Sequence, residues 1–222
     1  MTDALIQIPQ LMVDGVLFDM DGTLVDSTVV VEQMWTEFAH EVGVDAAEVV
    51  EFAHGRPSRE TIAKYAPDAQ DEWNARFTEG EATRFDDVVE IPGAAAFANS
   101  LPRGRWALVT SALHHPARAR LKAIGIEPPE VVIGAEDVER GKPDPEGYRK
   151  AAALLGLDPA RCVVFEDTDA GMTAGLEAGC VVIAMGDREG HELPVAGRIP
   201  DMTHIRAKVA ADGILICGVD AE

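Results

Sequence analysis

Cysteine and positive charge are both scarce in this sequence. Its 222 residues include three cysteines, Cys162, Cys180 and Cys217, and no C-x-x-C pair. We therefore expect free, buried thiols in a reducing compartment. Lysine and arginine number 19 against 39 acidic residues, which makes the formal net charge −20. This charge argues against nucleic acid or an anionic membrane as a partner, and any bound anion needs a local positive charge or a metal ion.

Long hydrophobic runs are absent as well. No apolar stretch approaches the ~20 residues of a membrane-spanning helix. Residues 1–10 have neither the basic segment nor the apolar segment of a signal peptide, so we expect a cytoplasmic protein. Apolar residues make up 47% and charged residues 26% of the chain, which is typical of a globular protein with a sizeable core. The length suits one large domain, or one domain with an insert.

Short apolar runs are present, and polar or glycine-rich residues follow each of them. The runs are residues 15–19, 106–111, 130–134, 162–167 and 180–186. Their unbroken Val and Ile content indicates strands that are buried on both faces. Helical patterns separate the later runs, at residues 115–125, 144–156 and 169–180. The alternation predicts an α/β fold with three layers and a parallel sheet. A final edge strand is expected at 213–219.

Residues 28–90 interrupt this alternation, because they contain no convincing strand. Helices are expected at 29–42, 46–53, 58–65 and 69–87. We therefore predict a helical cap domain, residues 28–90, inserted after the first strand. The core domain would consist of residues 1–27 and 91–222.

Two carboxylates follow the first strand, in the stretch "FDMDGTLVDS" at residues 18–27. The carboxyl ends of parallel strands meet in one crevice, so Asp19 and Asp21 should lie there. Two such close carboxylates tolerate one another if a cation lies between them or if one is protonated. Asp19 is a candidate nucleophile, and Asp21 a candidate general acid and base. Asp167, after a later strand, would complete an oxygen-rich site suited to Mg²⁺.

Three further side chains are expected in the same crevice. Thr110 and Ser111 end the strand at 106–111, and Lys142 lies a short loop beyond the strand at 130–134. Hydroxyls, backbone N–H groups and a lysine charge suit the binding of phosphate oxygens. These residues therefore predict a phosphate site next to the carboxylates.

The chain resembles the haloacid-dehalogenase-like phosphohydrolase superfamily, which has a Rossmann-like core. Four stretches match its motifs in order: "DMDGTLVDS", "VTSA", "GKPDP" and "VVFEDTDAG". The resemblance implies that Asp19 forms an aspartyl-phosphate and that Asp21 is the acid and base, with its backbone carbonyl on the metal. It further implies that Thr110 and Lys142 bind phosphate and that Asp167 is a metal ligand. Glu166 would be either a ligand or a support for one.

A narrower resemblance lies mostly in the predicted cap. The stretch "EFAHGRPSRETIAKYAPD" at 51–68 is similar to glycerol-3-phosphatases, 2-deoxyglucose-6-phosphatases and sugar phosphatases. It implies a Mg²⁺-dependent phosphatase whose partner is a small phosphorylated metabolite and which is a monomer or weak homodimer. His54, Gly55 and Arg56 are candidates for substrate binding. A surface or helix-capping role is the alternative for His54 and Arg56.

Two other functions stay open. Sugar phosphomutases of the β-phosphoglucomutase kind are similar, but they carry a histidine where this chain has Val31, which favours a hydrolase. A non-catalytic regulator could retain the fold, but we would then expect the loss of Asp19, Asp21 or Asp167. All three are present.

Overall fold

The computed structural model describes residues 8–53, 58–84, 88–186 and 193–219. The chain divides into two compact units. One unit contains residues 1–26 and 89–222, and the other contains residues 27–88. Each unit has its own buried apolar cluster, and each is described by itself below.

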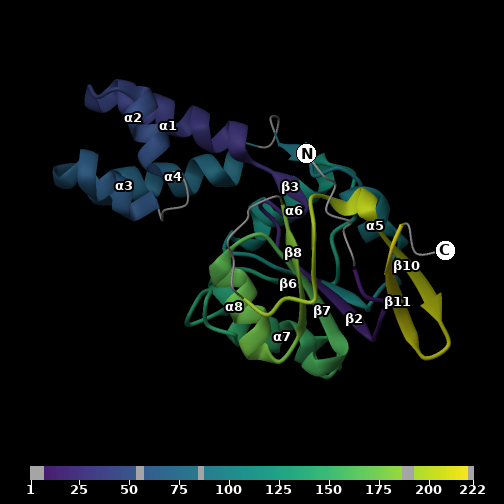
Figure 1. The fold of residues 1–222 in the computed structure, drawn as a ribbon. Helices are drawn as coiled ribbons and strands as arrows, with labels where there is room; N and C mark the ends of the chain where they lie inside the picture. Colours follow the sequence, from purple (N-terminus) through teal and green to yellow (C-terminus); the bar gives the residue numbers. More distant parts are fainter. Residues whose placement is uncertain (1–7, 54–57, 85–87, 187–192, 220–222) are drawn as a thin grey trace. The chain divides into compact units, whose positions relative to one another are not determined.

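A six-stranded sheet forms the centre of the larger unit, and all its neighbouring strands are parallel (Figure 1). The strand order is β6-β5-β2-β7-β8-β9. The strands are β2 (Gly15–Phe18), β5 (Trp106–Val109), β6 (Val131–Ile133), β7 (Cys162–Glu166), β8 (Val181–Met185) and β9 (Gly197–Ile199). The first strand of this sheet, β2, lies near its centre. Later strands are added first on one side of β2 and then on the other, as in Rossmann-like sheets. The predicted fold class is confirmed.

Helices lie on both faces of this sheet because its strands alternate side chains between the faces. Leu17 belongs to the apolar cluster under α7 (Glu146–Leu154) and α8 (Asp169–Ala178). The next residue, Phe18, packs instead on Phe97 of α5 (Ala94–Ser100). The sixth helix, α6 (His114–Ala123), follows β5. The two faces of the sheet thus have separate cores, which gives the predicted three layers.

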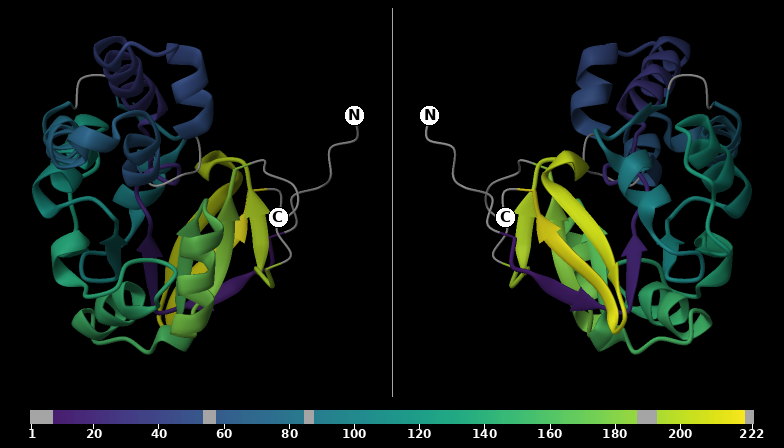
Figure 2. Two further views of the ribbon diagram at one scale, coloured as in Figure 1. Left: turned by 90° about the vertical axis from the view of Figure 1, so that its left-hand side faces the viewer. Right: turned by 90° about the vertical axis from the view of Figure 1, so that its right-hand side faces the viewer.

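A second, antiparallel sheet was only partly predicted. It consists of β1 (Leu11–Val13), β11 (Gly213–Gly218) and β10 (Ile205–Ala210), in that order. The prediction of an edge strand at 213–219 is wrong, because β11 is the central strand of this sheet. Figure 2 shows α8 in front in one view and the β10–β11 hairpin in front in the other, so they lie on opposite sides of the larger unit.

The two points where the chain passes between the units are paired. The short strands β3 (Val25–Asp26) and β4 (Val89–Glu90) form an antiparallel ladder. The smaller unit is helical in its described part. Its helices are α1 (Thr28–Val42), α2 (Ala46–Ala53), α3 (Ser58–Tyr65) and α4 (Gln70–Thr83). The last of these ends before residue 87, the predicted end, since Arg84 already has extended backbone angles.

Candidate active site

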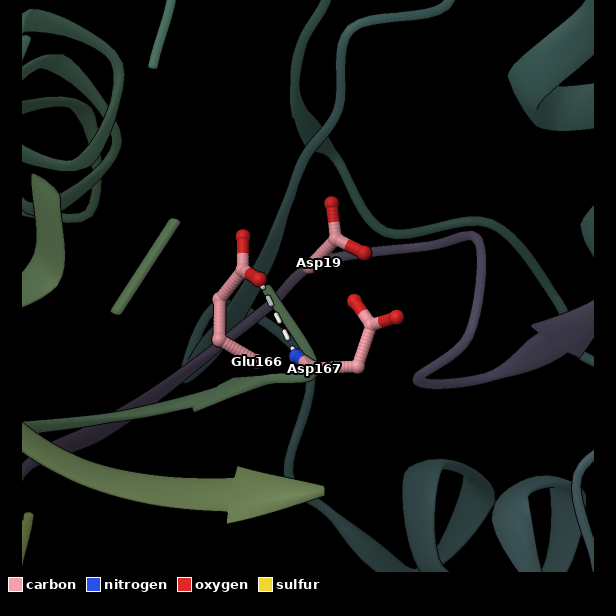
Figure 3. Close-up of side chains that lie close together, drawn as sticks. All are labelled: Asp19, Glu166 and Asp167. Atoms are coloured by element: carbon pink, nitrogen blue, oxygen red, sulfur yellow. Dashed lines mark hydrogen bonds between the residues drawn. The ribbon is translucent and has the colours of Figure 1, made fainter. Parts of the chain in front are cut away.

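Two neighbouring strands bring their polar residues to one edge of the parallel sheet. Asp19 follows β2, and Glu166 and Asp167 lie at the end of β7. One ligand atom from each of these carboxylates lies within 4.8 Å of the others (Figure 3). Asp19 and Glu166 are buried. The structure therefore brings together residues that are about 150 positions apart in the chain.

Lys142 connects two of these carboxylates. Its Nζ donates hydrogen bonds to Asp19 Oδ1 and, at 2.6 Å, to Glu166 Oε1. Burial would lower the pKa of Lys142, but Asp19 and Glu166 outweigh it and the pKa lies above its ordinary value. Lys142 is therefore a positive charge inside the site.

Negative charge is nevertheless in excess at this site. Burial raises the pKa of Asp19 well above its ordinary value; Lys142 opposes that rise, whereas Glu166 and Asp167 add to it. One lysine thus lies among three carboxylates, and a divalent cation would remove the imbalance.

Both oxygens of Glu166 already accept hydrogen bonds. Oε1 accepts from Lys142 and, at 3.0 Å, from the Tyr148 hydroxyl. Oε2 accepts from the backbone N–H groups of Asp167 and Thr168 and from the Thr168 hydroxyl, at 3.0–3.1 Å. Because each oxygen accepts hydrogen bonds from two or more donors, Glu166 is better suited to holding Lys142 and the β7–α8 turn than to binding a metal.

Two glycines make room for these carboxylates. At Gly22 the backbone φ is +84°, and a Cβ would lie 2.1 Å from Asp167 Oδ2. At Gly171, in the first turn of α8, a Cβ would lie 1.7 Å from Glu166 Oε1. No side chain can occupy these distances. The glycines in "DMDGT" and "EDTDAG" are therefore required by the site as well as by the local turns.

Asp21 has a different partner from Asp19. Its two carboxylate oxygens accept hydrogen bonds from Arg120 Nη1 of α6, at 2.9 and 3.2 Å. Arg120 is 3% exposed. Sequence analysis missed Arg120, although one signal was available. Ala117, Arg120 and Leu121 are all buried and have the i, i+3, i+4 spacing of one helix face, so an arginine interrupts an apolar stripe.

The predicted phosphate ligands lie beside Lys142. Thr110 is buried, and its hydroxyl accepts a hydrogen bond from the Ala112 N–H at 3.1 Å. Ser111 is exposed. Thr110, Ser111 and Lys142 all line a cavity of about 240 Å³ in the larger unit. These three residues thus border one cavity, as a shared phosphate site requires.

The predicted cap residues are not placed by the structure. His54, Gly55 and Arg56 lie outside the described residues. Val31 packs against the apolar cluster of the smaller unit. The three cysteines are free and buried, as predicted.

Comparison with known proteins identifies the family. A model of the haloacid dehalogenase-like hydrolases matches residues 13–179. The chain belongs to this family. Hexitol phosphatase A of Escherichia coli is 44% identical over 177 residues, which are 77% of this chain and 82% of the relative. Glycerol-1-phosphate phosphohydrolase 1 of Saccharomyces cerevisiae is 36% identical over 188 residues, 79% of this chain and 75% of the relative.

A solved structure supports the fold. CbbY from Rhodobacter sphaeroides, in complex with phosphate, superposes with a TM-score of 0.71 at 23% identity, over 86% of this chain and 95% of CbbY. The family and these relatives confirm the predicted resemblance and the predicted class of enzyme, a phosphoric monoester hydrolase. Among the described residues of this family member, no helix has the length and apolar character to cross a membrane.

Proposed function

We propose that this hydrolase acts on small sugar or polyol phosphates and that Asp19 is its nucleophile. The observation that supports this most directly is the placement of Asp19. It lies at the carboxyl edge of the sheet, buried, hydrogen-bonded to Lys142 and close to Asp167. Lys142 can hold the carboxylate of Asp19 and also attract the phosphate, which brings the nucleophile close to phosphorus.

Mg²⁺ is the proposed cofactor, and the residues present fit it. The excess of carboxylates over lysine calls for a cation, and the donors are oxygen atoms, as Mg²⁺ prefers. Asp19, Asp167 and the backbone carbonyl of Asp21 would hold the ion. When bound, Mg²⁺ would offset the charge of the phosphate and of the carboxylates around it.

The chain's own residues supply the remaining chemistry. Asp19 attacks phosphorus, so that a bond from its carboxylate oxygen forms while the bond to the leaving alcohol breaks. Asp21 gives a proton to that alcohol oxygen. Asp21 then takes a proton from water, which attacks phosphorus and releases inorganic phosphate and free Asp19. Lys142, Thr110 and Ser111 hold the phosphate oxygens throughout.

The leaving group is proposed to be a polyol or sugar. The two relatives described above are named for hexitol and glycerol phosphates, and both alcohols are flexible and rich in hydroxyls. We propose that the helical unit is a cap that selects among such alcohols through His54, Gly55 and Arg56. Loss of one hydrogen bond in a closed site would cost roughly 10- to 100-fold in kcat/KM, since such a bond is worth ~1–3 kcal/mol.

The test is a phosphate-release screen over polyol, hexose and deoxyhexose phosphates, with Mg²⁺ and after metal removal by EDTA. We expect turnover of at least one polyol or sugar phosphate that requires Mg²⁺, and a loss of at least ~10³-fold in kcat for Asp19→Asn. Full activity in excess EDTA would exclude the metal. Conversion of glucose 1-phosphate to glucose 6-phosphate without release of phosphate would favour the phosphomutase. No turnover of any ester would favour the non-catalytic regulator.

A further inference from the structure

A buried arginine lies behind the site, and the reaction as proposed gives it no role. Arg120 is 3% exposed, and its Nη1 donates to both oxygens of Asp21. The Asp21 side chain is 37% exposed. One end of this ion pair is therefore enclosed by protein, and the other end is partly exposed to solvent. An arginine is costly to bury, so a pair in this arrangement needs an explanation.

Arg120 lies on a firmly held element. Its own carbonyl accepts a hydrogen bond from the Ile124 N–H, and that of Leu121 accepts from Ile126, which anchors the end of α6. Ala117 and Leu121, on the same helix face, are fully buried. A side chain on such an element can fix the orientation of a partner in a loop.

The two aspartates of "DMD" thus pair with different cationic side chains. Lys142 binds Asp19, and Arg120 binds Asp21. We propose that Arg120 is a positioning residue that fixes the carboxylate of Asp21 for its proton transfers. This inference rests on the function proposed above, in which Asp21 is the acid and base.

The hydrogen bonds leave Asp21 able to work. A single nitrogen of Arg120 donates to the two oxygens, and each carboxylate oxygen has two lone-pair directions. The exposed side of the carboxylate can therefore exchange a proton with an alcohol or a water while Arg120 holds the other side. A merely structural arginine would also need a counter-charge, so the test must separate the two roles.

The dependence of kcat/KM on the leaving group distinguishes a positioning role for Arg120 from a structural one. The value of kcat/KM reports the steps up to departure of the leaving group. A polyol needs a proton from Asp21, whereas p-nitrophenolate leaves without one. In Arg120→Met we expect kcat/KM on the best polyol phosphate of the screen to fall about 10- to 100-fold, part of the typical contribution of a general acid. The fall on p-nitrophenyl phosphate should be several times smaller, and Arg120→Lys should restore part of the loss.

Arg118→Met is the matched control. Arg118 lies two residues earlier on α6 and donates to the Pro129 carbonyl at 3.1 Å, with no part in the Asp21 pair. We expect this variant to alter the melting temperature at most and to leave the ratio of kcat/KM on the two substrates unchanged.

A double-mutant cycle completes the test. In an Asp21→Asn background, Arg120→Met should have no further effect on kcat/KM, because Arg120 acts only through Asp21. If Arg120→Met alone fails to fold, the double variant, which lacks both charges, supplies the comparison with Asp21→Asn. Independent losses that multiply, or equal losses on both substrates, would overturn the inference. Absence of phosphatase activity in the wild-type enzyme would instead overturn the proposed function.

Discussion

At the scale of single residues, Asp19 and Asp21 lie two positions apart but have different partners. Asp19 is buried against Lys142, and Asp21 reaches Arg120. Asp19 and Asp21 thus have different cationic partners. The motif "DMDGT" was enough to predict that both residues matter. It held no information about Arg120, which follows 99 residues later.

Replacement of Asp19 tests the proposed nucleophile. Asp19→Asn keeps the shape of the side chain but removes its capacity to form an acyl-phosphate. We expect kcat to fall by at least ~10³, because the covalent route is lost. Steady-state phosphate release on the best substrate of the screen would measure this change.

The stability of Asp19→Asn provides the control for that experiment. Burial and two like charges raise the pKa of Asp19, so the ionised form is disfavoured in the folded protein without metal. We expect the metal-free variant to melt at the same temperature as the wild type or higher. Near wild-type turnover in a well-folded variant would contradict the aspartyl-phosphate route.

Gly171→Ala is a second test at the residue scale. In a helix this change usually stabilises, because glycine is the poorer helix former. Here a Cβ would lie 1.7 Å from Glu166 Oε1, and hydrogen bonds hold Glu166 in place. We therefore expect the free energy of unfolding to fall by about 1–3 kcal/mol, as measured by urea denaturation.

Gly80→Ala is the matched control. A Cβ at this position of α4 would lie 2.7 Å from the Cε end of Met34, a flexible side chain that can move aside. We expect a change close to zero or slightly stabilising. If Gly171→Ala were equally harmless, Glu166 would not be held as tightly as its hydrogen bonds indicate.

At the scale of elements, burial on both faces made the parallel strands predictable from the sequence. The residues of β2, β5 and β7 are all buried, so these strands appear as unbroken apolar runs. The strands β1, β9 and β10 were missed. They are short or largely exposed, and their pairing depends on distant partners. The stretch "ADG" at 211–213 was a local hairpin signal, and the two-residue turn Ala211-Asp212 does join β10 to β11.

Two cysteines at the start of neighbouring strands allow a test of this burial. Cys162 opens β7, and Cys180 directly precedes β8. Burial raises the pKa of the Cys162 thiol from 9.0 to about 11 and that of Cys180 to about 12. At pH 8 the reactive thiolate should be roughly 100-fold rarer or more than in the unfolded chain. We expect slow alkylation by iodoacetamide at both sites, measured by peptide mass spectrometry.

Denaturant supplies the control for the alkylation experiment. In urea both thiols should react at the rate of a free cysteine, since their raised pKa exists only in the folded state. The raised pKa values of the thiols also determine how stability changes with pH. As pH rises past 9.0 the unfolded state loses these protons first, so the thiols' contribution to stability is lost above that pH. Fast alkylation of native protein at pH 8 would show that these strands open readily.

At the scale of the whole molecule, two units with separate cores share one chain. The smaller unit buries Trp35, Phe38, Trp73 and Phe77 against one another. Trp106 lies in β5 of the larger unit, where it packs on Phe18. Tryptophan fluorescence can therefore report on each unit separately.

We predict that the two units unfold in separate transitions. In a Trp106→Phe background, fluorescence follows the smaller unit, and Phe38→Ala should destabilise it by about 3–5 kcal/mol, as is typical of a buried aromatic residue. In a background with Trp35→Phe and Trp73→Phe, fluorescence follows the larger unit. There, Phe38→Ala should leave the urea midpoint almost unchanged. Equal shifts of both midpoints would show that the units unfold as one.

The sequence alone determined the α/β class, the family and the identity of the groups at the strand ends. These features are local, because apolar runs mark buried strands and the polar residues directly follow them. The sequence also predicted that most of these groups gather in one crevice, but only the tertiary structure decided which of them pair directly. It placed Lys142 on Asp19 across 123 positions and Arg120 on Asp21 across 99. Such contacts depend on strand order and helix placement, which no single stretch of the chain encodes.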